Sequence, residues 1–237
     1  MREAVRTIEG WVSRRDAQYV CVTNVHGIME CQDDGAMRDI HRRAGLVVPD
    51  GMPLVWFARL RGRRGVERVY GPDLLLAVCA ASVSKGYRHF LYGGASRHVL
   101  DLLTDNLRCR FPGIRIAGAY SPPFRALTAE EDRTLVAQIN AARADIVWVG
   151  VGCPKNEQWM ASHVSRVEAP VLLGVGAAFD FIAGVKRQAP AWMRRAGLEW
   201  LFRLLAEPGR LWKRYLRNNP RFTVLAAMQL TGLRHYD

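Results

Sequence analysis

Cysteine is scarce in this chain of 237 residues, and its spacing is irregular. The five cysteines form no Cys-x-x-Cys pair, which disfavours a disulfide framework and a zinc site, so we expect reduced thiols. Long apolar runs are also missing, since the longest late one, residues 222–233, is too short to span a bilayer and contains Gln229. The first residues do not pair a basic start with an apolar stretch. A cytoplasmic protein is therefore expected.

Several motifs of nucleotide and metal chemistry are absent as well. There is no Gly-Lys-Ser/Thr of a P-loop, and the two Gly-x-Gly pairs have Lys155 and Phe179 where a dinucleotide motif has its third glycine. Nicotinamide chemistry and ordinary ATP hydrolysis are therefore disfavoured. No Asp-x-Asp occurs, and the six histidines lack metal-ligand spacing. We expect neither a metal ion nor a cofactor.

Acidic residues are few relative to basic ones. The chain has 34 Lys and Arg against 22 Asp and Glu, a net charge of +12. Residues 185–237 hold eleven of the basic residues and three of the acidic ones, so this segment alone carries +8. Such a segment favours a polyanionic partner, which leaves nucleic acid, an anionic membrane and a phosphorylated substrate open.

Apolar runs of strand length recur along the first 175 residues, with helix-length segments between most of them. This alternation predicts an α/β fold with a mainly parallel sheet covered by helices. The intervening helices have start signals, such as the capping box that begins at Thr128 and opens a helix to about Ala142. The predicted strands are Tyr19–Val25, Leu46–Val48, His89–Tyr92, Ile114–Ala117, Ile146–Val149 and Val171–Leu173.

The pattern changes after about Val185, where strands stop and apolar residues recur at helical spacing. Pro208 and Pro220 are expected to interrupt these helices. We therefore predict a core domain over residues 1–190 and a basic helical appendage over residues 191–237. Packing of the appendage onto the core is one interpretation; because aromatic residues lie among its Lys and Arg, attachment to an anionic membrane surface is the favoured one.

Three predicted strands end in glycine and lead into a probable helix, and in a parallel sheet such turns meet at one edge. Unpaired N–H groups at the start of the helix near Pro154 would face an anion, with Lys155 beside them. An ordinary strand-to-helix turn is the alternative for each one alone. The glycine turns contain Gly93 and Gly94, Gly150 and Gly152, and Gly174 and Gly176.

A Pro-Asp-Gly turn places Asp50 after another predicted strand. A carboxylate at that edge could accept a proton from an attacking hydroxyl, although a plain turn is the structural alternative. Because an aspartate in water has a pKa of about 3.9, burial would have to raise its basicity, or it would act by orienting the hydroxyl. Arg68 is the matching cation, which would clamp a phosphate unless it is merely solvated.

Eight segments, in order between about Thr23 and Pro220, resemble the WecG/TagA/CpsF glycosyltransferases. The resemblance implies a Rossmann-like core with a basic C-terminal appendage. It also implies inverting transfer of a sugar from a UDP-sugar to a polyprenyl-diphosphate-linked saccharide in bacterial cell-surface polysaccharide synthesis. The donor sugar would be of the N-acetylmannosamine, N-acetylmannosaminuronic acid or glucose type. The segments are Pro49–Trp56, Arg68–Leu74, Tyr92–Gly94, Phe111–Ile114, Tyr120–Phe124, Val149–Met160, Gly174–Phe181 and Gly197–Arg203.

The resemblance also assigns roles to residues. It makes Asp50 the candidate base and Arg68 the arginine that contacts the diphosphate. Asn24 and Asp180 match its donor-binding positions, and the functional arginines of its appendage fall on Arg203 and Arg210, with Lys213 where a further arginine is common. With the glycine turns and their neighbours, the candidate ligand-binding residues are Thr23, Asn24, Gly93, Gly94, Gly150, Gly152, Lys155, Asn156, Glu157, Asp180, Arg203 and Arg210.

Two departures from the family pattern lie near the expected donor. Asn156 stands where glutamine is usual, and Val22 stands where threonine is usual, with Thr23 adjacent. These positions put the donor sugar in question. The expected location is the inner face of the plasma membrane, reached peripherally, with homo-oligomerisation left open. A basic α/β nucleic-acid-binding module and a membrane-associated scaffold with a decayed site are the rival interpretations; the favoured one has no nucleic-acid partner.

Overall fold

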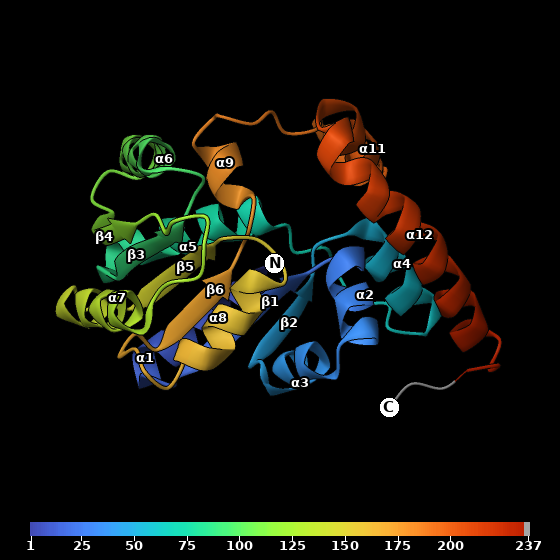
Figure 1. Cartoon of the computed structure of the whole chain (residues 1–237), viewed down its shortest axis with the longest axis horizontal. Coiled ribbons are helices and arrows are strands. Elements are labelled where there is room, and N and C mark those ends of the chain that lie inside the picture. The colour runs from blue at the N-terminus through green and yellow to red at the C-terminus, as the bar shows by residue number, and fades with distance from the viewer. Residues whose placement is uncertain (235–237) are drawn as a thin grey trace.

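The computed structural model describes residues 1–234, so the last three positions of the predicted appendage lie outside the described residues. Six parallel strands form one sheet in the order β2-β1-β6-β5-β3-β4 (Figure 1). Every predicted strand is confirmed, with shifted ends. The first ends two residues early because Asn24 caps the next helix. The strands are β1 (Gln18–Thr23), β2 (Leu46–Pro49), β3 (Arg88–Gly93), β4 (Arg115–Tyr120), β5 (Ile146–Gly150) and β6 (Val171–Gly174).

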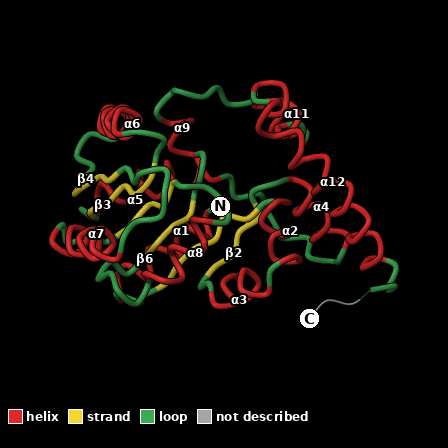
Figure 2. Tube along the Cα trace, viewed as in Figure 1, coloured by secondary structure: helices red, strands yellow, loops and turns green. Residues whose placement is uncertain are grey.

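Helices connect the strands, and Figure 2 shows them around the yellow sheet. The capping box predicted at Thr128 is confirmed, since Thr128 and Glu131 each accept a hydrogen bond from the other's backbone N–H. The helices of the core are α1 (Arg2–Arg14), α2 (Val25–Asp33), α3 (Gly35–Arg43), α4 (Met52–Leu60), α5 (Gly71–Lys85), α6 (Arg97–Arg110), α7 (Ala129–Ala141), α8 (Lys155–His163) and α9 (Ala178–Ile182).

Apolar side chains fill both faces of the sheet, which confirms the α/β fold with helices on two sides. Alternate residues of β5 divide between the faces, because side chains along a strand point to opposite sides. Trp148 packs with α1, α5, α6 and α9, whereas Val147 and Val149 pack with α2, α3, α7 and α8.

The carboxyl ends of the strands share one edge, and the turns that follow them are neighbours there. The chain leaves β3 toward β4 and leaves β5 toward β6, on opposite sides of the β3–β5 pair. In open α/β sheets, the crevice at such a switch point is where ligands bind. Gly93 and Gly150, which are paired in the sheet, lie at this switch point.

Three further helices follow the sheet: α10 (Ala191–Arg195), α11 (Glu199–Ala206) and α12 (Pro208–Leu230). Figure 1 shows α12, in red, alongside α2 and α4, away from the strands. Rings of Phe57 on α4 and Phe222 on α12 lie 6.3 Å apart. Arg217 and Arg221 of α12 pair with Asp33 at the end of α2.

The prolines of this region have different effects. Pro208 separates α11 from α12, as predicted, but the interruption predicted at Pro220 is wrong because α12 runs through it. A proline in a helix deprives the carbonyl four residues earlier of its donor. Here that residue is Leu216, whose side chain is 69% exposed, so the helix surface there is open to water. Contacts of α12 with α2 and α4 then hold the continuous helix. None of the described helices is both long and apolar enough to cross a bilayer.

Candidate active site

Asp50 follows β2 directly, and its backbone N–H donates to the Thr23 carbonyl at 2.8 Å. Its side chain is only 20% exposed, and Oδ1 has no hydrogen-bond partner among the described residues. Burial raises the pKa of Asp50 to about 6, helped by the negative charge of Glu199 and opposed by Arg68, Arg203 and the Gly71 amide. The site therefore holds a carboxyl group whose pKa suits a base near neutral pH.

Arg68 lies beside this carboxylate and is held by several partners. Its Nη2 lies 3.5 Å from Asp50 Oδ1 and donates to Glu199 Oε2 at 2.5 Å. Its Nε donates to the Asp50 carbonyl, and its Nη1 donates to the Arg194 carbonyl at 3.2 Å. The guanidinium also stacks 4.5 Å from the centre of the Tyr70 ring. The predicted pair of Asp50 and Arg68 is thus brought together, and Arg68 is fixed in orientation.

Two residues of this centre were missed by the sequence reasoning. Glu199 begins α11 and reaches Arg68 from 131 positions away, so no local pattern signals it. The Tyr70 hydroxyl is buried without a hydrogen-bond partner among the described residues, and burial raises its pKa. A buried, unpaired hydroxyl beside a carboxylate and a guanidinium is a group that a bound ligand could satisfy.

A cavity of about 550 Å³ opens at Asp50 and Arg68 and runs between α4 and α12. Its volume is that of ordinary small-molecule sites, which are about 300–1,000 Å³. Four predicted site residues line it, from the core and the appendage: Asn24, Asp50, Arg68 and Arg203. The appendage thus forms one wall of the cavity.

Asn24 has a structural role at this cavity. It is the N-cap of α2, and its Oδ1 accepts hydrogen bonds from the N–H groups of His26 and Gly27 at 3.0 and 3.3 Å. A cap of this kind satisfies donors that the helix leaves unpaired. The side chain that resembles a donor-binding position is therefore held rigidly at the cavity wall.

Arginines of the appendage gather at the same end of the cavity. Arg203 lies close enough to oppose the rise in the pKa of Asp50, and its guanidinium is 5.8 Å from the centre of the Phe181 ring. Arg214, which sequence reasoning left unassigned, also lines the cavity, and its Nε is buried without a hydrogen-bond partner among residues 1–234. Burial lowers the pKa of Arg214, Tyr215 opposes this shift, and Arg203 and Arg210 add to it. Arg210 itself pairs with Glu207 and does not line the cavity.

The predicted convergence of the glycine turns is confirmed. The Gly94 N–H donates to the Gly150 carbonyl at 3.1 Å. A Cβ on Gly93 would lie 2.5 Å from the Gly150 backbone, so only glycine allows these two strands to end side by side. Gly152 has a φ of +90° and open space where a side chain would project. These turns lie at the switch-point crevice, whereas the α4–α12 cavity lies at the ends of β1 and β2.

The polar groups after β5 differ from the prediction. Asn156 is buried, and its Oδ1 accepts from the N–H groups of Val151 and Gly152, both at 2.9 Å. The Asn156 N–H in turn donates to the Gly152 carbonyl. The Val151 and Gly152 N–H groups of the turn are thus paired with a side chain of the protein, and among the helix-start donors predicted to be unpaired, the N–H of Asn156 is paired as well. Lys155 is exposed and begins α8, with Pro154 as the N-cap before it rather than at the first helical position.

Thr23 and Glu157 lie beneath these turns, outside the α4–α12 cavity. Thr23 is buried, and its hydroxyl lies 3.1 Å from Nε2 of His41. Glu157 is buried next to Cys153, burial raises its pKa, and its Oε2 has no hydrogen-bond partner among the described residues. Asp180 on α9 forms an ion pair of 2.9 Å with Lys186. The structure therefore divides the predicted site residues between the cavity and the glycine-turn edge.

The described residues contain no cluster of three or more His, Cys, Asp or Glu side chains placed to hold a metal ion. The positive charges that act on Asp50 are those of Arg68 and Arg203, and Arg214 lines the same cavity. Preorganised cations of this kind can stabilise developing negative charge in a site that excludes water.

Comparison with known proteins agrees with these features. Residues 1–236 match the family described as the glycosyl transferase WecG/TagA/CpsF family. A Bacillus subtilis protein named N-acetylglucosaminyldiphosphoundecaprenol N-acetyl-beta-D-mannosaminyltransferase is 35% identical over 179 residues, which are 75% of this chain and 67% of the relative. Relatives of the same name from Bacillus spizizenii and Staphylococcus aureus are 29% and 28% identical, covering 87% and 76% of this chain and 77% and 66% of their own length. Because the family match spans nearly the whole sequence, the chain belongs to the WecG/TagA/CpsF family and is a glycosyltransferase.

Proposed function

We propose that this glycosyltransferase transfers a hexose or N-acetylhexosamine, with inversion, from a UDP-sugar to a polyprenyl-diphosphate-linked saccharide. The observation that carries the proposal is the Asp50 carboxyl group, which has a pKa of about 6 and an unpaired Oδ1, at a cavity that also holds three arginines. The acceptor class follows the names of the relatives, which specify an N-acetylglucosaminyl-diphosphoundecaprenol.

In this reaction Asp50 accepts the proton of the acceptor hydroxyl while the hydroxyl oxygen attacks the anomeric carbon of the donor. The bond between that carbon and the β-phosphate oxygen breaks, and its electron pair leaves with UDP. Arg68 and Arg203, which lie next to Asp50, are suited to stabilise the charge on the leaving diphosphate. This stabilisation acts only as the bond breaks, so its loss would lower kcat.

The donor fits the crevice between β3 and β5, where the glycine turns allow close approach of backbone to a ligand. Gly152 offers open space at this crevice, and Lys155 is exposed beside it. Asn24 follows β1 and Asp180 follows β6, both on the β6 side of that strand pair, and the resemblance expects contacts to the donor from these two residues. N-acetylmannosamine is the first candidate sugar because it is the one named in the relatives.

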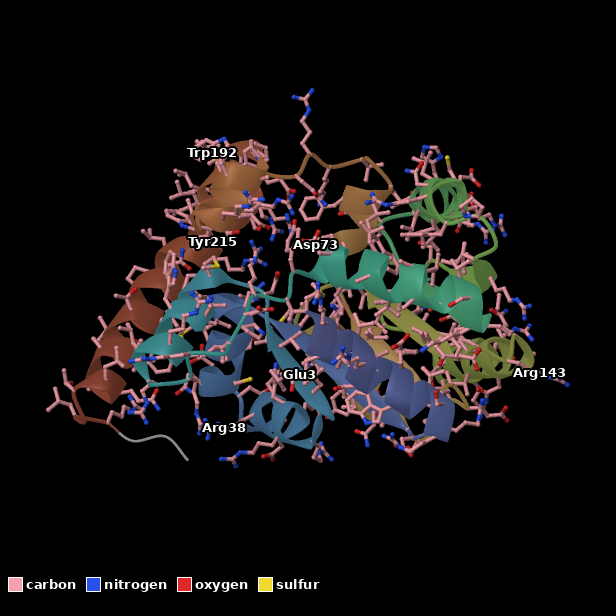
Figure 3. All side chains as sticks on the ribbon, turned by 180° about the vertical axis from the view of Figure 1, so that it is seen from behind. Glu3, Arg38, Asp73, Arg143, Trp192 and Tyr215 are labelled. Carbon is pink, nitrogen blue, oxygen red and sulfur yellow. The ribbon has the colours of Figure 1, made fainter. Side chains whose placement is uncertain are left out.

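In this proposal the core of residues 1–190 and the appendage of residues 191–237 have different roles. The core holds the donor, and the appendage adds Arg203 and Arg214 and rests on the membrane that contains the acceptor. Exposed apolar side chains among basic ones support this role: Trp192, Leu205, Trp212 and Leu216 are 64%, 73%, 48% and 69% exposed. Figure 3 shows Trp192 at the upper edge of the molecule, above Tyr215. The protein would then work at the inner face of the plasma membrane.

Release of UDP in the presence of a panel of UDP-sugars and an N-acetylglucosaminyl-diphosphate-prenyl acceptor tests the proposal. We expect release with one or a few donors, only when the acceptor is present, and a product that is longer by one sugar. The absence of UDP release across the panel, together with salt-dependent RNA binding, would support the rival nucleic-acid-binding module instead.

A further inference from the structure

A groove with apolar walls runs from the charged end of the cavity to the far end of α12. Along α4 it is lined by Trp56, Phe57 and Leu60, and along α12 by Phe222, Ala226 and Leu230. Met52 at the start of α4 approaches Gly197, which precedes α11, and Phe57 farther along α4 meets Phe222 of α12. Arg214 and Leu230 are separated by about 24 Å of helix, given 1.5 Å per residue.

The apolar character of α4 is not explained by the protein core. Its sequence, Met-Pro-Leu-Val-Trp-Phe-Ala-Arg-Leu, is apolar on nearly every side, yet Val55 is the only residue of this helix that is buried. Trp56 remains 45% exposed and Leu60 remains 71% exposed, while Leu230 across the groove is 40% exposed. A contiguous apolar surface that the fold leaves in contact with water indicates a binding site.

The charge at the inner end of the groove restricts the occupant to an anionic amphiphile. Arg214 lines the cavity there, and among residues 1–234 no carboxylate lies within ion-pair distance of it. Its Nε is buried without a hydrogen-bond partner among the described residues, and Tyr215 favours its charge while Arg203 and Arg210 oppose it. An anionic head group would accept a hydrogen bond from this Nε and offset the repulsion from the neighbouring arginines. An apolar chain attached to that group would continue along α4 and α12.

We propose that the groove between α4 and α12 binds the first isoprene units of the acceptor's polyprenyl chain, with the acceptor diphosphate at Arg214. This inference rests on the proposed function for the identity of the acceptor. In this proposal the enzyme takes the part of the lipid next to the diphosphate out of the bilayer. It then binds a longer prenyl chain more tightly than a shorter one. The acceptor sugar then reaches Asp50, at the opposite side of Arg214 from the groove.

Binding of short, water-soluble prenyl diphosphates without any membrane tests the proposal. Titration calorimetry would compare farnesyl diphosphate, isopentenyl diphosphate and inorganic diphosphate. Farnesyl diphosphate should bind the unaltered protein at least tenfold more tightly than isopentenyl diphosphate, because ten more carbon atoms leave water. Ala226→Trp, which fills the groove, and Leu60→Glu, which places a carboxylate in it, should each abolish that difference. Both sites are partly or fully exposed, so the fold should tolerate these changes.

Val224→Trp is the matched control, because Val224 lies on the same helix, is 58% exposed and does not line the groove. This variant should keep the preference for the longer chain. Equal affinity of the three diphosphates for the unaltered protein would overturn the proposal, as would a preference that survives both groove variants. If Ala226→Trp changes the oligomeric state in sedimentation without changing prenyl binding, the groove is an interface between copies of the chain and the proposal is likewise wrong.

These outcomes are separable from failure of the proposed function. The binding experiment involves no sugar donor and no turnover, so it can succeed or fail whichever reaction the enzyme catalyses. Turnover with N-acetylglucosaminyl-diphosphate acceptors that is independent of prenyl length in detergent-free solution would leave the proposed function intact and remove the groove as a chain-binding site.

Discussion

Glu199 Oε2 accepts a hydrogen bond from Arg68 Nη2 at 2.5 Å, and this contact joins the appendage to the centre of the site. The same Nη2 lies 3.5 Å from Asp50 Oδ1, so one guanidinium group lies between two carboxylates. Glu199 thereby orients Arg68 and, through its charge, helps burial to raise the pKa of Asp50. Docking of α11 on the core and the basicity of the candidate base are thus coupled.

Replacement of Glu199 by Gln should shift the pH dependence of the reaction. Asp50 must be ionised to accept a proton, and its pKa is about 6, so kcat/KM of the unaltered enzyme should fall as the pH drops through about 6. Removing the neighbouring negative charge makes ionisation of Asp50 easier, which lowers its pKa and moves this acidic limb to lower pH. Rates of UDP release between pH 4.5 and 8 measure the shift. Glu130→Gln, on the exposed start of α7, is the control, and an acidic limb that stays in place in both variants would contradict the coupling.

Replacement of Asp50 by Asn should lower turnover by roughly 100-fold or more, which is the usual contribution of a positioned base. The amide keeps the shape of the side chain but cannot take a proton at this pH. Binding of UDP, followed by calorimetry, should remain close to that of the unaltered protein because the donor crevice is at the glycine turns. Unchanged turnover would refute the assignment of Asp50 as the base.

The same replacement should stabilise the protein against unfolding at neutral pH. The pKa of Asp50 rises from 3.8 to about 6 on folding, so the folded state holds the proton more tightly. The resulting cost is absent below pH 3.8, grows as the pH rises between the two values and is complete above about pH 6. At about 1.36 kcal/mol per pKa unit, Asp50→Asn should gain up to roughly 3 kcal/mol at pH 7. Urea unfolding at pH 7 and pH 4 measures this, and an equal effect at both values would contradict it.

Local patterns in the sequence were sufficient for the sheet, both helical layers and the place of Asp50. The sheet and the place of Asp50 follow from which residues end a strand, since the ends of parallel strands share an edge. Arg68 lies in the loop between α4 and α5, and its pairing with Asp50 was proposed from its charge and from the resemblance to the family. The contact between Arg68 and Glu199 could not be predicted in this way, because it depends on where α11 docks. Pro220 misled the prediction because one lost hydrogen bond costs less than the packing of a long helix on α2 and α4.

Asn156 shows a second limit of sequence reasoning. A glycine turn before a helix has the same pattern whether its N–H groups face a ligand or a side chain of the protein. Here the Asn156 side chain accepts two of them, and nothing in the spacing of the residues distinguishes the two cases. Whether Asn156 also influences the choice of donor sugar remains a prediction.

Replacement of Asn156 by Ala should therefore destabilise the protein. It leaves the Val151 and Gly152 N–H groups without their acceptor, and each unsatisfied buried donor costs about 1–3 kcal/mol. We expect a loss of about 2–4 kcal/mol in the free energy of unfolding, visible as a lower midpoint in urea. Gln158→Ala, two residues along on the exposed side of α8, should change it by less than about 0.5 kcal/mol. Asn156→Gln tests the role in donor choice, which requires an altered ratio of kcat/KM between two UDP-sugars.

Attachment to anionic vesicles should depend on exposed apolar residues of the appendage. Trp192→Ser combined with Leu205→Ser removes two side chains that are 64% and 73% exposed, and should reduce co-sedimentation with phosphatidylglycerol vesicles several-fold. Phe124→Ser is the control, because Phe124 is 91% exposed but belongs to the loop before α7. If the Phe124→Ser variant loses as much co-sedimentation as the appendage variant, any exposed apolar residue suffices, and the appendage has no special role in attachment.

Replacement of Arg214 by Ala should weaken acceptor binding more than it slows the chemical step. Arg214 lies on α12, whereas Arg68 and Arg203, the arginines whose charges act on Asp50, lie before α5 and on α11. In the proposed complex the charge of Arg214 therefore acts on the acceptor diphosphate before and during the reaction alike. Uniform binding of that kind changes KM and leaves kcat nearly constant. We expect KM for the prenyl-linked acceptor to rise about 10- to 100-fold, as steady-state kinetics with varied acceptor would measure. Arg217→Ala, one turn further on, removes a side chain that is 71% exposed and paired with Asp33, and should leave both constants unchanged. A fall in kcat at constant KM would instead place Arg214 at the leaving group of the donor.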